Sequence, residues 1–161
     1  MSHNPFEAPA SMDVPSSEVL VGGLPLATQG QRFVNLIIDQ IIIQICSFIG
    51  GLVLGGVYVA SNGGAALSPD QSSTLELLGF AVGIVVVIGY FIVMEALFQR
   101  TIGKMATGTR VVTVNGGVPS FGQIVGRSFA RLIPFEAFSF LGKIPCGWHD
   151  TLSGTRVIKS R

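Results

Sequence analysis

The sequence contains little charge, and a long central part of it has no basic side chain. Only 12% of its 161 residues are Asp, Glu, Lys or Arg, and 48% are hydrophobic, whereas soluble domains are about 25% charged. Neither Lys nor Arg occurs at residues 33–99. A soluble chain of this size would need more charge to cover its surface, so the composition indicates a membrane protein. The net charge of +1 gives no reason to expect a nucleic-acid partner.

A disulfide framework and a signal peptide are also missing. The two cysteines, Cys46 and Cys146, are too few and too far apart for a disulfide framework, so both are expected to be unpaired. Residues 1–31 are polar, acidic and rich in proline, without the basic start and apolar centre of a signal peptide. We expect residues 1–28 to be a disordered cytoplasmic tail and the first apolar helix to be an uncleaved anchor.

The sequence has no recognisable motif of enzymatic chemistry. It lacks a nucleophile–base pattern, a phosphate-binding loop and a zinc-binding helix pattern. His149 and Asp150 are adjacent, but no second group of His or Cys supports a metal site there. We therefore expect no enzymatic activity, no cofactor and no bound metal.

Two long apolar segments predict transmembrane helices at about residues 33–59 and 75–98. At 1.5 Å per residue, each can cross a hydrocarbon core of about 30 Å. A buried pair of helices in a soluble protein is the alternative, but such helices are rarely this long and this poor in charge. The loop between the segments has no basic residue, whereas Arg32 precedes the first and Arg100 follows the second. By the positive-inside rule, both termini should be cytoplasmic.

Small residues recur at a spacing of four in both apolar segments, at Ser47, Gly51 and Gly55 in the first and at Gly79 and Gly83 in the second. Small side chains allow close approach of helices in lipid. We expect these faces to bring the two helices together or to form a homo-oligomer; the alternative is that lipid simply tolerates the glycines.

The part of the chain after the second apolar segment predicts short strands. Asn115-Gly116 follows a run of β-branched residues, which indicates a hairpin at about residues 108–119. A strand at about residues 154–159 repeats the Gly-Thr-Arg-Val pattern of residues 108–111. The two similar strands could pair and close a small sheet if they lie on the same side of the membrane.

An amphipathic helix is expected at about residues 121–142, after a capping-box pattern at Ser120 and Gln123. Pro134 should bend it. A complete span would carry Arg127 and Arg131 into the bilayer at about 2.5–3.5 kcal/mol each, so an interfacial or re-entrant helix is favoured. The predicted fold is therefore a mainly α membrane protein with two transmembrane helices, this amphipathic helix and a small cytoplasmic β-hairpin or sheet.

Asp39 and Glu95 are acidic residues inside the apolar segments, and a third, Glu76, lies at the very start of the second segment. Asp39 lies about two helical turns after Arg32, with Asn35 between them on the same face. Acidic residues at such positions suggest function by default, and Arg32 would keep Asp39 charged. The alternative is that an Arg32–Asp39 pair only holds helices together. Glu95 lies near the end of the second segment, where its side chain can also extend to the interface.

Several motifs follow one another in the order found in the RDD family of membrane proteins. They are Arg32 with Asp39, the Thr101-Ile-Gly-Lys104 run, Asn115-Gly-Gly-Val-Pro-Ser120, Arg127-Ser-Phe-Ala-Arg131, and Trp148-His-Asp-Thr-Leu-Ser-Gly-Thr155. The sequence resembles this family over about residues 28–161, which implies an RDD domain at residues 29–161 in a bacterial-type plasma (inner) membrane. The family is named for one arginine and two aspartates, which the resemblance assigns to Arg32, Asp39 and Asp150.

Two functions fit these residues. The first is an oligomeric cation/proton transporter or transporter component, as the resemblance implies for a few family members. Asp39, with Glu95 as a second candidate, would bind monovalent cations or protons. In that hypothesis Arg32 would tune Asp39, while Asp150 and the arginine helix would gate the cytoplasmic side. The second is an interaction or assembly protein of the lipid bilayer whose charges form a closed structural network. In both hypotheses the supporting residues are Asn35, Glu95, Arg127, Arg131 and His149.

Overall fold

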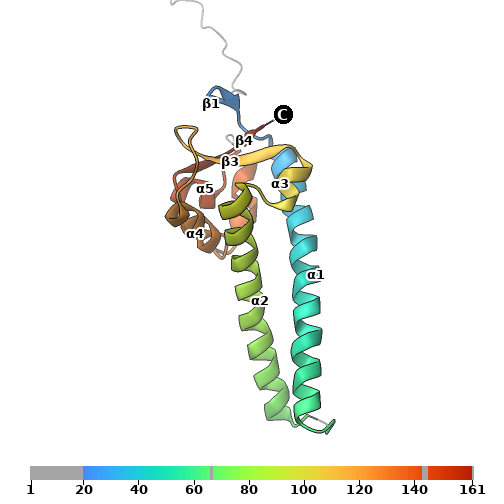
Figure 1. The fold of residues 1–161 in the computed structure, drawn as a ribbon. Coiled ribbons are helices and arrows are strands. Elements are labelled where there is room, and N and C mark those ends of the chain that lie inside the picture. The colour runs from blue at the N-terminus through green and yellow to red at the C-terminus, as the bar shows by residue number, and fades with distance from the viewer. Residues whose placement is uncertain (1–19, 66, 143–144, 161) are drawn as a thin grey trace, which may run out of the picture.

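Two long antiparallel helices extend from one compact group of short elements (Figure 1). The computed structural model describes residues 20–65, 67–142 and 145–160; residues 1–19 of the tail expected at residues 1–28 lie outside the described residues. Helix α1 spans Gln29–Ser61 and helix α2 spans Pro69–Phe98. Both are long and apolar enough to cross a membrane, and they contain the two segments predicted from the sequence.

Capping residues determine where both long helices begin. The Thr28 hydroxyl accepts a hydrogen bond from the Gln31 backbone amide, and the Thr28 backbone amide donates one to the side-chain oxygen of Gln31. Ser68 and Gln71 form the same reciprocal pair at the start of α2. Such capping boxes satisfy backbone donors that have no partner inside the helix. They explain why each helix starts several residues before its apolar segment.

The remaining described elements form what we call the cap, residues 20–28 and 99–160 without the gap at 143–144. In Figure 1 they gather at the end of the helix pair that holds the start of α1 and the end of α2. In chain order the elements are β1 (Leu20–Val21), β2 (Leu24–Pro25), α3 (Ile102–Ala106), β3 (Thr109–Thr113), α4 (Phe121–Ala130), η1 (Glu136–Leu141), α5 (Trp148–Leu152) and β4 (Thr155–Lys159).

The two similar strands of the cap pair with each other, as their repeated sequence suggested. Strands β3 and β4 are antiparallel, with Val111 opposite Val157 and Thr113 opposite Thr155. The hairpin expected at residues 108–119 is only partly present. A turn at Gly116 has positive φ (83°), but no described strand follows it. Strand β3 pairs with β4 instead.

The N-terminal part of the cap is ordered from residue 20, which differs from the disordered tail expected up to residue 28. Strands β1 and β2 form a small antiparallel pair, and the Ala27 amide donates to the Val157 carbonyl at 2.9 Å. Val21 and Leu26 are buried against Val112 and Ile158. Burial of these apolar side chains stabilises the segment.

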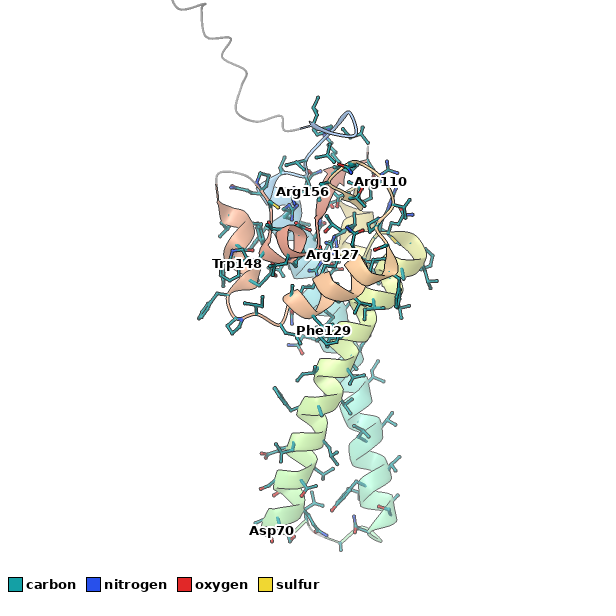
Figure 2. The ribbon with its side chains drawn as sticks, turned by 90° about the vertical axis from the view of Figure 1, so that its left-hand side faces the viewer. Asp70, Arg110, Arg127, Phe129, Trp148 and Arg156 are labelled. Atoms are coloured by element: carbon teal, nitrogen blue, oxygen red, sulfur yellow. The ribbon has the colours of Figure 1, made fainter. Side chains whose placement is uncertain are left out.

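The helix expected at residues 121–142 is divided in two. Helix α4 ends at Ala130, four residues before Pro134, and the 3-10 helix η1 follows. The Ser120–Gln123 capping box is present as predicted. With 10 residues, α4 is too short to cross a bilayer, which needs about 20. Its Arg127 side points into the cap, and Phe129 points away from the cap interior (Figure 2). An interfacial position for α4 stays a prediction.

The glycine faces of the two long helices make no close contact within this chain. A Cβ atom added at Gly51, Gly55, Gly79 or Gly83 would meet no other side chain or helix within 4 Å. Three of these glycines instead line an apolar groove of about 340 Å³ between the far ends of α1 and α2. The expected contact of these faces inside one chain is therefore absent, while the homo-oligomer stays a prediction.

Candidate functional site

Charged side chains gather where the long helices meet the cap, although the surrounding segments are apolar. We call them the charge cluster, and Figure 2 shows one member, Arg127, at the centre of the cap. All but Arg131 are buried, and Arg131 is half-buried. The cluster consists of Arg32, Asp39, Glu95, Lys104, Arg127, Arg131 and Asp150.

Glu95, in the last turn of α2, binds three basic side chains of the cap. Its carboxylate lies 2.8 Å from Lys104 Nζ, 2.9 Å from Arg127 Nε and 3.2 Å from Arg131 Nη2. Its side chain is 0% exposed. Arg131 also stacks on Phe91, with its guanidinium carbon 4.0 Å from the ring centre. Glu95 therefore attaches α3 and α4 to the end of α2 rather than extending into solvent.

Asp150, in α5, is the second buried carboxylate with several partners. Arg32 Nη1 lies 2.6 Å from Asp150 Oδ2, and Arg127 Nη2 lies 3.1 Å from Oδ1. The Gly147 amide also donates to Oδ2, at 3.2 Å. Arg127 therefore bridges Asp150 and Glu95, and joins α4 to both α5 and α2.

Asp39 accepts three hydrogen bonds and, among the described residues, contacts no basic side chain closely enough for an ion pair. The Tyr90 hydroxyl and the Gly103 amide donate to Oδ1 at 2.7 and 2.8 Å, and the Thr101 hydroxyl donates to Oδ2 at 2.6 Å. The expected Arg32–Asp39 pair is wrong, because Arg32 lies nearer the cap and reaches Asp150 instead. Asp39 therefore holds the start of α3 against α1 and α2.

Asn35 and His149 extend the polar contacts around the cluster. The Asn35 amide lies 3.1 Å from the Thr109 hydroxyl, which joins α1 to β3. His149 contacts Glu136 through Nδ1 and lies 3.3 Å from Asp150 Oδ1 through Nε2. Both nitrogens of the ring thus face carboxylate oxygens, one of Glu136 and one of Asp150.

Burial and nearby charges change the pKa values of two members of the charge cluster, Lys104 and Asp150, and of Glu136 beside it. Burial lowers the pKa of Lys104 to about 8, although Glu95 opposes this shift; Lys104 is therefore still mostly charged at neutral pH. Burial alone would raise the pKa of Asp150, but His149, Arg32 and Arg127 outweigh it and hold the pKa well below its usual value. The pKa of Glu136 is lowered in the same way, chiefly by its hydrogen bond from His149.

The lowered pKa of Asp150 predicts a loss of stability in acid. Above the unfolded value of 3.8 the ionised carboxylate stabilises the fold, and this contribution is lost as the pH falls through the lower folded value. The melting temperature in detergent should therefore fall below about pH 4, and Asp150→Asn should flatten this part of the curve. A wild-type curve that stays level from pH 5 to pH 2 would contradict the ion pairs of Asp150.

The sequence predicted most members of the cluster but not all of their hydrogen-bond and ion-pair partners. Seven of the eight candidate residues lie in the cluster or, like His149, in direct contact with it, and the eighth, Asn35, binds Thr109 beside the cluster. The sequence prediction missed Lys104, Tyr90, Thr101 and Glu136. Lys104 and Thr101 stand in the Thr101-Ile-Gly-Lys104 run and could have been noted as polar groups next to an apolar helix. Tyr90 gives no such signal, because an aromatic residue is ordinary in an apolar segment.

Comparisons with known proteins agree with this arrangement of motifs. The chain matches the RDD family over residues 26–153. It is also similar to the uncharacterized protein YxaI of Bacillus subtilis (strain 168), with 31% identity over 143 residues, which covers 79% of this chain and 93% of the relative. No solved structure shows a significant match. The match to the family covers both long helices and the whole charge cluster, and the chain belongs to the RDD family.

Proposed function

We propose that this chain is a non-transporting interaction or assembly protein of the membrane, in which the charge cluster attaches a cytoplasmic cap to two membrane-spanning helices. One observation carries the proposal. The three acidic residues at the junction, Asp39, Glu95 and Asp150, are 4%, 0% and 0% exposed, and each is bound by at least two donors. Such a network has a structural role without any bound ion.

The two long helices support a position in the membrane. Their outward faces carry large apolar side chains that are exposed in the isolated chain, which soluble proteins avoid over so large an area. The loop between the helices contains no basic residue, and Asp70 lies beside it at the end far from the cap (Figure 2). The positive-inside rule then gives a multi-pass protein of a bacterial-type plasma membrane with the cap in the cytoplasm.

Exposed apolar side chains on α4 and the segment after it support contact between the cap and the bilayer surface. They lie on a basic, amphipathic helix and just after its end, and this composition is typical of interfacial segments. Trp148 projects from the edge of the cap in Figure 2 and is an interfacial residue type. The other exposed side chains are Phe121, Phe129, Leu132, Ile133, Phe135, Phe138 and Leu141.

The contacts of Asp39 weigh against the transport hypothesis. A carboxylate that carries an ion must exchange its partners for the ion and for water. Asp39 would have to release the Gly103 amide and the Thr101 hydroxyl, which separates α3 from α1. Two spans alone also enclose no pathway. We therefore assign Asp39 a positioning role. We also propose that the chain has no enzymatic activity.

Proton and cation flux in liposomes tests the proposal. We expect wild-type protein to produce no proton movement above that of protein-free liposomes with a trapped pH dye under Na⁺ or K⁺ gradients. An ionophore serves as the positive control for sealed vesicles.

Asp39→Asn removes a carboxylate acceptor from three hydrogen bonds, so we expect a loss of about 1.5–3 kcal/mol in the free energy of unfolding.

Asp70→Asn is the matched control, because Asp70 is exposed at the far end of α2 and its change should leave stability unaltered. Cation-dependent proton flux in wild-type protein that disappears in folded Asp39→Asn, but persists in Asp70→Asn, would overturn the proposal in favour of antiport.

A further inference from the structure

A cavity of about 50 Å³ lies beside the charge cluster, between α1, η1 and α5. A water molecule needs roughly 10–15 Å³ measured in this way, so the cavity has room for a small polar group. Its walls are polar toward the cap, with Arg32 and Arg131, and include Leu36, Gln40 and Phe140 on other sides.

Two of the side chains that line this cavity, Arg32 and Arg131, carry buried donors without a partner. Arg32 is 6% exposed, and its Nη1 binds Asp150, but its Nε and Nη2 have no hydrogen-bond partner among the described residues. The same holds for Nε of Arg131. A buried charged donor left without an acceptor costs more than 1 kcal/mol, so such groups are usually paired with protein, water or a ligand.

The other charged groups that line the cavity are already engaged. Asp39 accepts three hydrogen bonds, and Glu136 is bound by His149. Lys104 binds Glu95. Among the described residues, the buried atoms of the cavity-lining side chains that lack a partner are all donors of guanidinium groups. The missing partner must be an acceptor.

We infer that this cavity binds a phosphate oxyanion, the group shared by phospholipid headgroups and inorganic phosphate. A guanidinium presents two parallel N–H donors that match two oxygens of a phosphate, and Nε with Nη2 of Arg32 forms such a pair. Arg32 lies in the first turns of α1, and the apolar wall at Leu36 and Phe140 suits the acyl chains of a lipid. This inference goes beyond the proposed function and does not depend on it.

Thermal unfolding of the full chain, delipidated in detergent, tests the inference and separates the two sources. Inorganic phosphate is compared with chloride at equal ionic strength, and phosphatidylglycerol is compared with diacylglycerol, which lacks the phosphate. A rise in melting temperature of a few degrees with phosphatidylglycerol alone identifies a lipid headgroup. A rise with inorganic phosphate identifies a free anion. No rise with either would overturn the inference.

Variants locate the binding. Gln40→Glu adds a negative charge to the cavity wall at an exposed residue and should weaken the apparent affinity about tenfold, or by about 1.4 kcal/mol. Asn115→Asp makes the same chemical change in the exposed turn after β3, and should leave binding unchanged. Ala137→Phe, which fills the cavity from η1, should abolish the stabilisation. Wild-type affinity in both cavity variants would place the ligand elsewhere and refute the inference.

Discussion

Glu95→Gln is expected to lower the free energy of unfolding by about 3–5 kcal/mol, the usual cost of removing one partner from a buried ion pair. The neutral amide leaves Lys104, Arg127 and Arg131 without their shared counter-charge. Because Glu95 is fully buried, water cannot replace it without opening the cap. Denaturant titration in detergent micelles, followed by tryptophan fluorescence of Trp148, measures the change.

Glu76→Gln provides the matched control for this experiment. Glu76 lies in the same helix and is exposed, so its neutralisation should alter stability by less than about 0.5 kcal/mol. Equal stability of Glu95→Gln and Glu76→Gln would show that the ion pairs of Glu95 do not hold the cap to α2.

Gly103→Ala is expected to destabilise the junction by about 1–3 kcal/mol or more, as overpacking of a close contact does. A Cβ atom at residue 103 would lie 2.4 Å from the Asn35 carbonyl oxygen and 2.9 Å from the Asn35 Cα. Both atoms belong to the backbone of α1 and cannot rotate away. Relief requires α3 to move from α1, which lengthens the hydrogen bond from the Gly103 amide to Asp39.

Gly126→Ala, in the middle of α4, is the control for the loss of a helical glycine. A Cβ atom there meets nothing within 4 Å, and alanine in a helix interior is favoured over glycine by about 0.5–1 kcal/mol. Melting temperatures of the two variants should therefore move in opposite directions. A stabilised Gly103→Ala protein would mean that α3 and α1 do not approach as closely as this structure shows.

Local sequence patterns were enough to predict the long helices and the pairing of the cap strands. Apolar residues over one continuous segment report a span without knowledge of any neighbour, and the repeat of Gly108-Thr-Arg-Val in Gly154-Thr-Arg-Val indicated two strands of the same kind. The end of α4 at Ala130 was missed because the apolar pattern continues through Leu132 and Ile133 beyond the helix.

The partners of the charged residues could be predicted only in part. Arg32 and Asp39 share a helical face, so sequence spacing made them a pair, but the carboxylate of Asp39 is taken by α3. The position of α3 depends on the chain turning back after Gln99, a residue with positive φ (56°) in a left-handed conformation that few non-glycine residues adopt. Nothing in the sequence around Gln99 indicates that reversal.

The Arg32–Asp150 pair has a consequence for biosynthesis. It joins residues 118 positions apart, so a ribosome that has made both long helices has not yet produced the partner of Arg32. Glu95 likewise waits for Arg127 and Arg131, which are synthesised after it. Until α4 and α5 have been synthesised, these charges lack their partners in the cluster, and Asp150 of α5 completes their neutralisation. Assembly of the junction therefore follows the synthesis of both long helices.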